Sequence, residues 1–144
     1  MIDALQAMGS VLFDPYLVVL IFITTVLGVV IGVLPGLGAT TGAALLLPFT
    51  LTMQPVHAIA VLATIYVSAT FAGSITAILI NTPGTSAAAA TTFDGYPLAQ
   101  RGEAGRALGI AVVSSTIGGI FSIIILCIAA PMLARVAYEF RPPE

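Results

Sequence analysis

The chain has 144 residues, of which 59% are hydrophobic and 7% are charged, and its formal net charge at pH 7 is -2. An ordinary soluble domain carries about 25% charged residues, and four arginines with six acids cannot form a polar shell around so apolar a chain. The composition therefore predicts an all-α integral membrane protein whose outer face meets lipid. The negative charge excludes nucleic-acid binding, because no basic stripe is present to neutralise phosphates.

The first part of the chain predicts an interfacial helix followed by a membrane span. Residues 1–13 place apolar side chains at helical spacing, which favours a short helix lying in the interface. Asp14 followed by Pro15 is typical of a helix N-cap and first helical position. An uncharged apolar run then continues to Leu34, and about 20 residues at 1.5 Å each cross the hydrocarbon. We therefore expect a span over 15–34.

A Pro-Gly break interrupts this apolar run at Pro35–Gly38. The apolar sequence resumes for only about a dozen residues before Pro48, roughly 18 Å of helix, which is too short to cross a bilayer. We therefore expect a re-entrant half-helix over 36–47. Pro55 then opens a second charge-free run, which predicts a span over 56–80.

A second break follows at "NTPGTS", residues 81–86, and we expect a second half-helix over 85–92. The sequence "DGYP", beginning at Asp94, has the chemistry of a turn. Residues 93–106 predict a charged loop outside the hydrocarbon, because a charge at mid-bilayer costs at least ~2.5 kcal/mol. Residues 107–130 then predict a third span that ends before Pro131.

The two breaks are the candidate functional residues. Non-helical backbone at membrane depth survives only where protein or a water-filled cavity surrounds it. Each break leads into a helix start whose free N–H groups suit an anion, and hydroxyl side chains follow directly. Such discontinuous helices form substrate and ion sites in secondary transporters. The candidate substrate- or ion-binding residues are Pro35, Gly36, Gly38, Thr40, Thr41, Asn81, Thr82, Pro83, Gly84, Thr85 and Ser86.

Another interpretation is that the breaks serve only helix packing, since Gly and Pro are frequent in membrane helices. The chain would then be a non-transporting integral membrane assembly subunit. "GLGATTG" is not a dinucleotide motif, because Thr41 occupies the position of the third glycine and no strand precedes it. We expect no enzyme, cofactor or bound metal, because the apolar segments contain no paired carboxylates, no nucleophile with a base and no metal-ligand cluster.

The motifs "GVLPGLGATTGAALLLPFT" and "ILINTPGTSAAAATTFDGYPLAQRGEAGRALGIA" resemble the large membrane subunit of the bacterial tripartite tricarboxylate transporters. The resemblance covers roughly residues 17–130 and places both breaks on the family's signature loops. It implies a multi-pass protein of the bacterial inner membrane that takes up tricarboxylates or related carboxylates by ion-driven symport. Members are longer and built from two inverted halves, so the chain corresponds to an N-terminal portion, as a fragment, a split gene product or a truncation.

The same resemblance implies the partners of the chain. These are a small membrane subunit, a periplasmic solute-binding protein that delivers the carboxylate, and the remainder of the large subunit. The coupling ion expected is sodium or a proton. Asp94 and Arg106 are accessory site candidates, although Arg106 is also explained as a solvated interfacial arginine beside Glu103. Orientation stays open, because two arginines precede the last apolar segment and two follow it.

Overall fold

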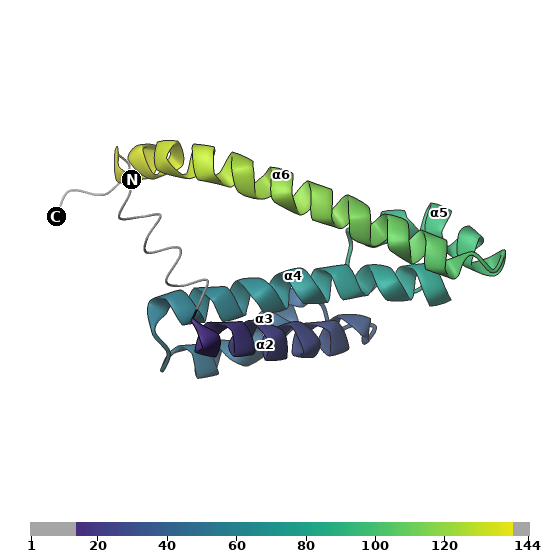
Figure 1. The fold of residues 1–144 in the computed structure, drawn as a ribbon, viewed down its shortest axis with the longest axis horizontal. Helices are drawn as coiled ribbons and strands as arrows, with labels where there is room; N and C mark the ends of the chain where they lie inside the picture. The colour runs from purple at the N-terminus through teal and green to yellow at the C-terminus, as the bar shows by residue number, and fades with distance from the viewer. Residues whose placement is uncertain (1–13, 140–144) are drawn as a thin grey trace. The chain divides into compact units, whose positions relative to one another are not determined.

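In a computed structural model of the protein, the structure describes residues 14–139, with side chains up to Ala130 and at Leu133. The helices follow in chain order as α2 (Pro15–Val33), α3 (Ala39–Thr50), α4 (Pro55–Ile80), α5 (Ala89–Gln100) and α6 (Ala104–Glu139) (Figure 1). The described residues contain no strand, and the expected all-α class is confirmed. The expected interfacial helix over 1–13 lies outside the described residues.

Three of these helices are long and apolar enough to cross a membrane: α2, α4 and the part of α6 from Ala104 to Ala130. α3 is apolar but has only 12 residues, about 18 Å of helix. The chain forms two compact units, residues 1–108 and residues 109–144. The second unit contains most of α6, and the candidate residues all lie in the first.

α2 begins where the sequence predicts. Asp14 is extended and caps the helix, its carboxylate Oδ1 accepting a hydrogen bond of 3.0 Å from the Tyr16 N–H. Pro15 occupies the first helical position, where its missing N–H leaves no bond unmade. The local sequence is therefore sufficient to start this helix.

α2 and α4 run in the same general direction and cross, and they approach closely through small residues. The side chain of Asp14 contacts that of His57 at the beginning of both helices, and farther along Gly32 lies against Ala69. A methyl group at Gly28 would overlap the Ser68 side chain, and one at Gly32 would overlap the Ala69 backbone. Glycine on α2 thus lets the two backbones meet, as small residues do in membrane helix pairs.

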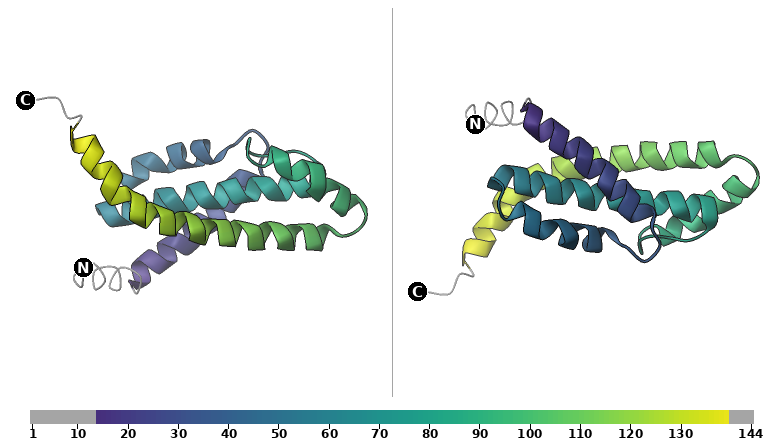
Figure 2. Two further views of the ribbon diagram at one scale, coloured as in Figure 1. Left: turned by 90° about the horizontal axis from the view of Figure 1, so that it is seen from above. Right: turned by 90° about the horizontal axis from the view of Figure 1, so that it is seen from below.

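α3 returns antiparallel to both helices. α3 begins halfway along α4, where Gly42 lies against the side chains of Ile31 and Ile65. Residues 51–54 join the end of α3 to the beginning of α4. Figures 1 and 2 show α3 beside α4, with α2 crossing α4. The fully buried side chain of Ile65 fills the centre of this three-helix unit.

α5 packs along the last turns of α4 and corrects two expectations. The half-helix was expected over 85–92 and a turn at "DGYP", but the helix extends from Ala89 to Gln100. Gly95 is buried, and a methyl group added there would lie 2.7 Å from Ile78 Cγ1. Burial of this close contact outweighs the turn propensity of Asp94–Pro97, since propensity is a weak prior beside tertiary packing. The expected charged loop 93–106 is therefore helical except at residues 101–103.

Two prolines expected to end helices lie inside them. α3 continues through Pro48 to Thr50, and α6 continues through Pro131 to Glu139. At the end of α3 the buried Thr50 hydroxyl donates to the Leu47 carbonyl at 2.8 Å. That bond satisfies a carbonyl of the last turn, whereas the carbonyl that Pro48 leaves without an N–H donor is that of Ala44.

Candidate functional site

The first break is an open turn between α2 and α3. Leu34 is extended and donates its N–H to the Ile31 carbonyl at 3.2 Å, and the Leu37 N–H bonds to the Leu34 carbonyl at 3.1 Å. Gly36 has φ +91°, and a methyl group added there would meet no atom within 4 Å. Glycine is therefore required at this position by backbone conformation and not by space.

α3 begins immediately after this turn with unsatisfied donors. Its first backbone hydrogen bond runs from the Gly42 N–H to the Gly38 carbonyl at 3.1 Å. The N–H groups of the residues before Gly42, from Ala39 to Thr41, consequently have no acceptor within the helix. Together with the partial positive charge of a helix N-terminus, they make this end favourable for an anion.

The second break starts with a left-handed residue. Asn81 caps α4 with φ 56° and ψ 28°, and its N–H bonds to the Thr76 carbonyl. The Thr82 N–H bonds to the same carbonyl at 3.3 Å. Asn tolerates this conformation better than most residues, so Asn81 ends the helix and turns the chain back towards its middle.

The returning loop is fixed against the crossing of α2 and α4. The Gly84 N–H donates to the Gly73 carbonyl at 3.3 Å. A methyl group on Gly84 would lie 2.7 Å from the Gly32 carbonyl oxygen and 2.9 Å from the Gly73 Cα. Glycine is therefore required at this position because three backbone segments meet there.

A helical turn then leads from this loop into α5. The Ala88 N–H bonds both to the Thr85 hydroxyl at 3.2 Å and to the Thr85 carbonyl at 3.1 Å, so Thr85 caps this turn, and Ala88 is the N-cap of α5. From this point α5 runs towards the end of α4, whereas α3 runs towards its beginning. The two short helices thus start near the same place and lead in opposite directions.

The start of α3 and the turn before α5 line one cavity of about 480 Å³. Seven of the predicted site residues line it: Gly36, Gly38, Thr40, Thr41, Gly84, Thr85 and Ser86. Residues separated by more than forty positions in the sequence thus line the same cavity. No charged side chain lines the cavity, so the donors it offers are backbone N–H groups and hydroxyls.

The remaining predicted residues have other places. Pro35, Asn81, Thr82 and Pro83 flank the cavity in sequence without lining it. The Thr82 hydroxyl donates to the Ile80 carbonyl at 3.2 Å. These residues belong to the two breaks but not to the cavity lining.

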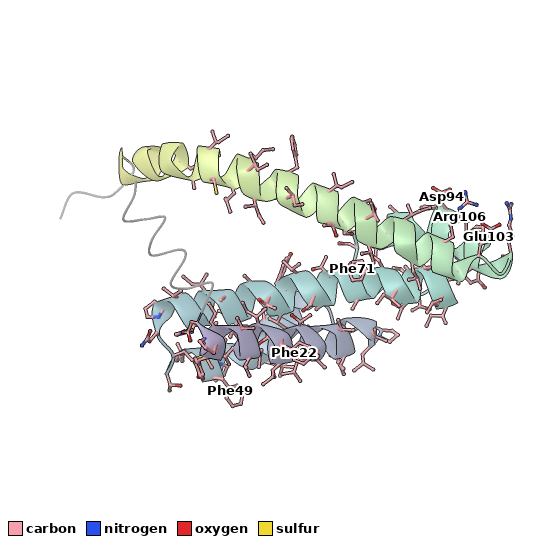
Figure 3. The ribbon with its side chains drawn as sticks, viewed as in Figure 1. Phe22, Phe49, Phe71, Asp94, Glu103 and Arg106 are labelled. Atoms are coloured by element: carbon pink, nitrogen blue, oxygen red, sulfur yellow. The ribbon has the colours of Figure 1, made fainter. Side chains whose placement is uncertain are left out.

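The two accessory candidates also lie away from the cavity lining. Asp94 is exposed on α5. The Arg106 guanidinium donates to the Glu103 carboxylate at 2.9 Å, with the two side chains 70% and 44% exposed. Figure 3 shows Glu103 and Arg106 at the turn that joins α5 and α6. Arg106 is therefore an exposed arginine paired with Glu103.

Sequence analysis missed two polar lining residues, as well as Ala39 and Ala87. Tyr66 and Thr70 of α4 border the cavity, and the Thr70 hydroxyl donates to the Tyr66 carbonyl at 2.7 Å. A signal was present, because polar side chains four residues apart share one face of a helix. The apolar character of the whole span concealed it.

No group of three or more His, Cys, Asp or Glu side chains that could hold a metal ion exists among residues 14–139. The cavity residues also include no nucleophile with an adjacent base. What the arrangement can do chemically is donate several hydrogen bonds to an anion from neutral groups.

Comparison with known proteins identifies a family that matches most of the chain. A model described as the tripartite tricarboxylate transporter TctA family matches residues 18–144. The chain is also similar to an uncharacterized 52.8 kDa protein in the TAR-I ttuC' 3' region of Agrobacterium vitis, with 47% identity over 130 residues. The alignment covers 90% of the chain and 26% of that protein, so the chain spans about a quarter of its relative's length. No solved structure matches the chain.

Proposed function

Because the chain belongs to the tripartite tricarboxylate transporter TctA family, we propose that it forms the N-terminal portion of the membrane subunit of a secondary transporter. That transporter takes up tricarboxylates or related carboxylates across the bacterial inner membrane and uses an ion gradient. The observation that carries the proposal is the single cavity lined by both breaks.

The cavity fits a carboxylate by its donors. One side presents the beginning of α3 with the Thr40 and Thr41 side chains, and the other presents Thr85 and Ser86 before α5. Neutral donors fixed by the fold bind an anion without burying a permanent positive charge, which would be costly at membrane depth. Tyr66 and Thr70 complete the wall on α4.

The coupling ion and the partners extend this proposal. Sodium or a proton would balance part of the charge of a carboxylate in a cavity without cationic side chains. The other half of the site would come from the remainder of the large subunit. A small membrane subunit and a periplasmic solute-binding protein would complete the transporter, with the binding protein delivering the substrate.

The packing interpretation has one observation in its favour. Gly84, Gly73 and Gly32 touch through their backbones, so part of the second break serves helix packing whatever else it does. A non-transporting assembly subunit would need only these contacts. It would not need the hydroxyl groups of Thr40 and Ser86, which line the cavity.

Uptake of a radiolabelled carboxylate by the reconstituted full transporter separates the two functions. Thr40→Val and Ser86→Ala remove one hydroxyl each from the cavity, and we expect each to weaken apparent substrate affinity. The loss of a hydrogen bond to a charged partner costs roughly 1.5–3 kcal/mol, about ten- to a hundredfold.

The control is Thr25→Val, since the Thr25 hydroxyl bonds to the Ile21 carbonyl within α2 and Thr25 does not line this cavity. Uptake is normalised to the amount of protein in the membrane. Unchanged affinity in the Thr40→Val and Ser86→Ala double variant would favour the assembly subunit.

A further inference from the structure

A second polar cluster lies at the end of the bundle where α2 and α4 begin. His57 Nε2 and Asp14 Oδ2 are 3.1 Å apart, although the two residues are 43 positions apart in the chain. Their side chains are 14% and 35% exposed. The rings of Tyr16 and His57 meet edge to face, with centroids 5.4 Å apart. The cluster therefore ties the first turn of α2 to the first turn of α4.

Within the described residues, the helices and the connection that meet at this end carry no charged side chain besides Asp14 and His57. The sequence from Pro15 to Phe93 contains no Asp, Glu, Lys or Arg, and His57 is the only histidine of the chain. Asp14 and Tyr16 at the start of α2 and His57 of α4 are the titratable side chains at this end. Neither α3 nor residues 51–54 contain a titratable side chain. Asp3 and the terminal amino group precede Asp14 in the chain and lie outside the described residues.

A cavity of about 560 Å³ opens beside the pair and makes it reachable from solvent. It is lined by Asp14, Tyr16, Thr52, Met53, Gln54 and His57. The cavity lies between the two helix starts and the connection from α3. Separation of those helix starts would expose it further.

From this geometry we propose that Asp14 and His57 form a proton-binding clasp that closes this end of the three-helix unit more firmly at acidic than at alkaline pH. An imidazole ordinarily titrates between about pH 5 and 8. When it is protonated, both partners of the hydrogen bond are charged, and the attraction between opposite charges adds to the bond. When it is neutral, only the carboxylate carries a charge.

Asp14 is suited to this role because it stays ionised over the whole range. The hydrogen bond from His57, followed by that from the Tyr16 N–H, lowers the pKa of Asp14 below its ordinary value of 3.8. The clasp thus joins a fixed anion at the start of α2 to an imidazole at the start of α4. It does not depend on a carboxylate being the transported substrate, so it stands apart from the function proposed above.

The test measures opening of the cavity by thiol labelling. Met53→Cys, which lines the cavity, reports opening, and Leu51→Cys, which is 79% exposed on the same connection, serves as the reference. Both are made in the full-length protein in membrane vesicles, with Cys127 and any other cysteine replaced by serine. The reagent is a small neutral maleimide that crosses membranes, so that orientation does not matter.

The ratio of the two labelling rates cancels the pH dependence of thiol chemistry. We expect this ratio to fall by up to about fivefold between about pH 8 and pH 5.5, the gain expected when the hydrogen bond becomes a partly exposed ion pair. His57→Gln retains a donor without titrating, and Asp14→Asn retains the N-cap without the charge. Both variants should give a ratio independent of pH, whereas Asp3→Asn should behave as the parent.

A flat ratio in the parent protein would overturn the proposal, as would a pH dependence that persists in His57→Gln. Loss of the pH dependence in Asp3→Asn would also overturn it, because the titrating partner would then lie in the N-terminal segment.

Discussion

The two breaks share the dipeptide Pro-Gly but need their glycines for different reasons. Gly36 adopts φ +91° in open surroundings, whereas Gly84 lies against the Gly32 carbonyl and Gly73 Cα. The first glycine satisfies a backbone conformation and the second satisfies a lack of space. Identical motifs in one chain can therefore respond differently to the same mutation, and each response tests the structure.

The largest effect is expected for Gly84→Ala. The new methyl group would lie 2.7 Å from the Gly32 oxygen, and a backbone atom cannot rotate away as a side chain can. Overpacking of this kind costs about 1–3 kcal/mol. We expect a lower thermal midpoint and a lower yield of folded full-length protein in detergent.

The matched control for Gly84→Ala is Gly38→Ala. Gly38 has φ -77°, and a methyl group there would find only the Thr40 hydroxyl at 3.8 Å. It should therefore fold normally. Equal thermal stability of the two variants would mean that Gly84 does not lie in the close backbone contact described.

Gly36→Ala should have a smaller effect that arises from strain alone. An alanine in left-handed backbone conformation costs about 1–2 kcal/mol, with no steric overlap to add to it. Asn tolerates this region better, so Gly36→Asn should recover part of the stability. If thermal unfolding shows Asn and Ala to be equally harmful, then space and not conformation constrains the first break.

Asn81 tests the start of the second break. Asn81→Ala places a poorly suited residue at φ 56° and should cost about 1 kcal/mol in thermal stability. Asn81→Gly should be at least as stable as the parent, because glycine adopts this conformation freely. Since Asn81 does not line the cavity, substrate affinity should remain unchanged in both variants. A loss of substrate affinity with normal thermal stability would indicate that Asn81 takes part in substrate binding.

The smallest effect is expected at the far end of the bundle, where acid should weaken the Asp14 contacts and leave both breaks intact. The pKa of Asp14 is lowered in the folded protein, chiefly by the hydrogen bond from His57. Its contribution to stability is therefore present above the ordinary value of 3.8 and is lost as the pH falls below that value.

Thermal unfolding of detergent-solubilised protein over this acid range measures the effect. Asp14→Asn should lack this component while keeping the cap, and added salt should reduce the component in the parent because the pair is partly exposed. An unaltered acid dependence in Asp14→Asn would contradict the assignment.

Several features of the fold could be predicted because they depend on neighbours in sequence. The Asp14 cap, Pro15 and the apolar runs act through the nearest turn of helix, so α2 and α4 begin close to the expected residues. The interruptions at Pro35 and after Ile80 follow from the chemistry of Pro, Gly and Asn in the same way. The ends expected at Pro48 and at Asp94–Pro97 were wrong. α3 continues through Pro48, and the buried Gly95 stabilises helix where local propensity opposes it.

The site was predicted in part for the same reason. The sequence by itself determined that two breaks exist and that each leads to free N–H groups and hydroxyls, since these properties belong to short segments. Only the tertiary structure decided that Gly84 returns to Gly73 and brings both breaks to one cavity with Tyr66 and Thr70. It also paired Asp14 with His57 across 43 positions. Such contacts depend on how closely the small residues of α2 and α4 allow their backbones to approach, a property of two helices together and not of either sequence alone.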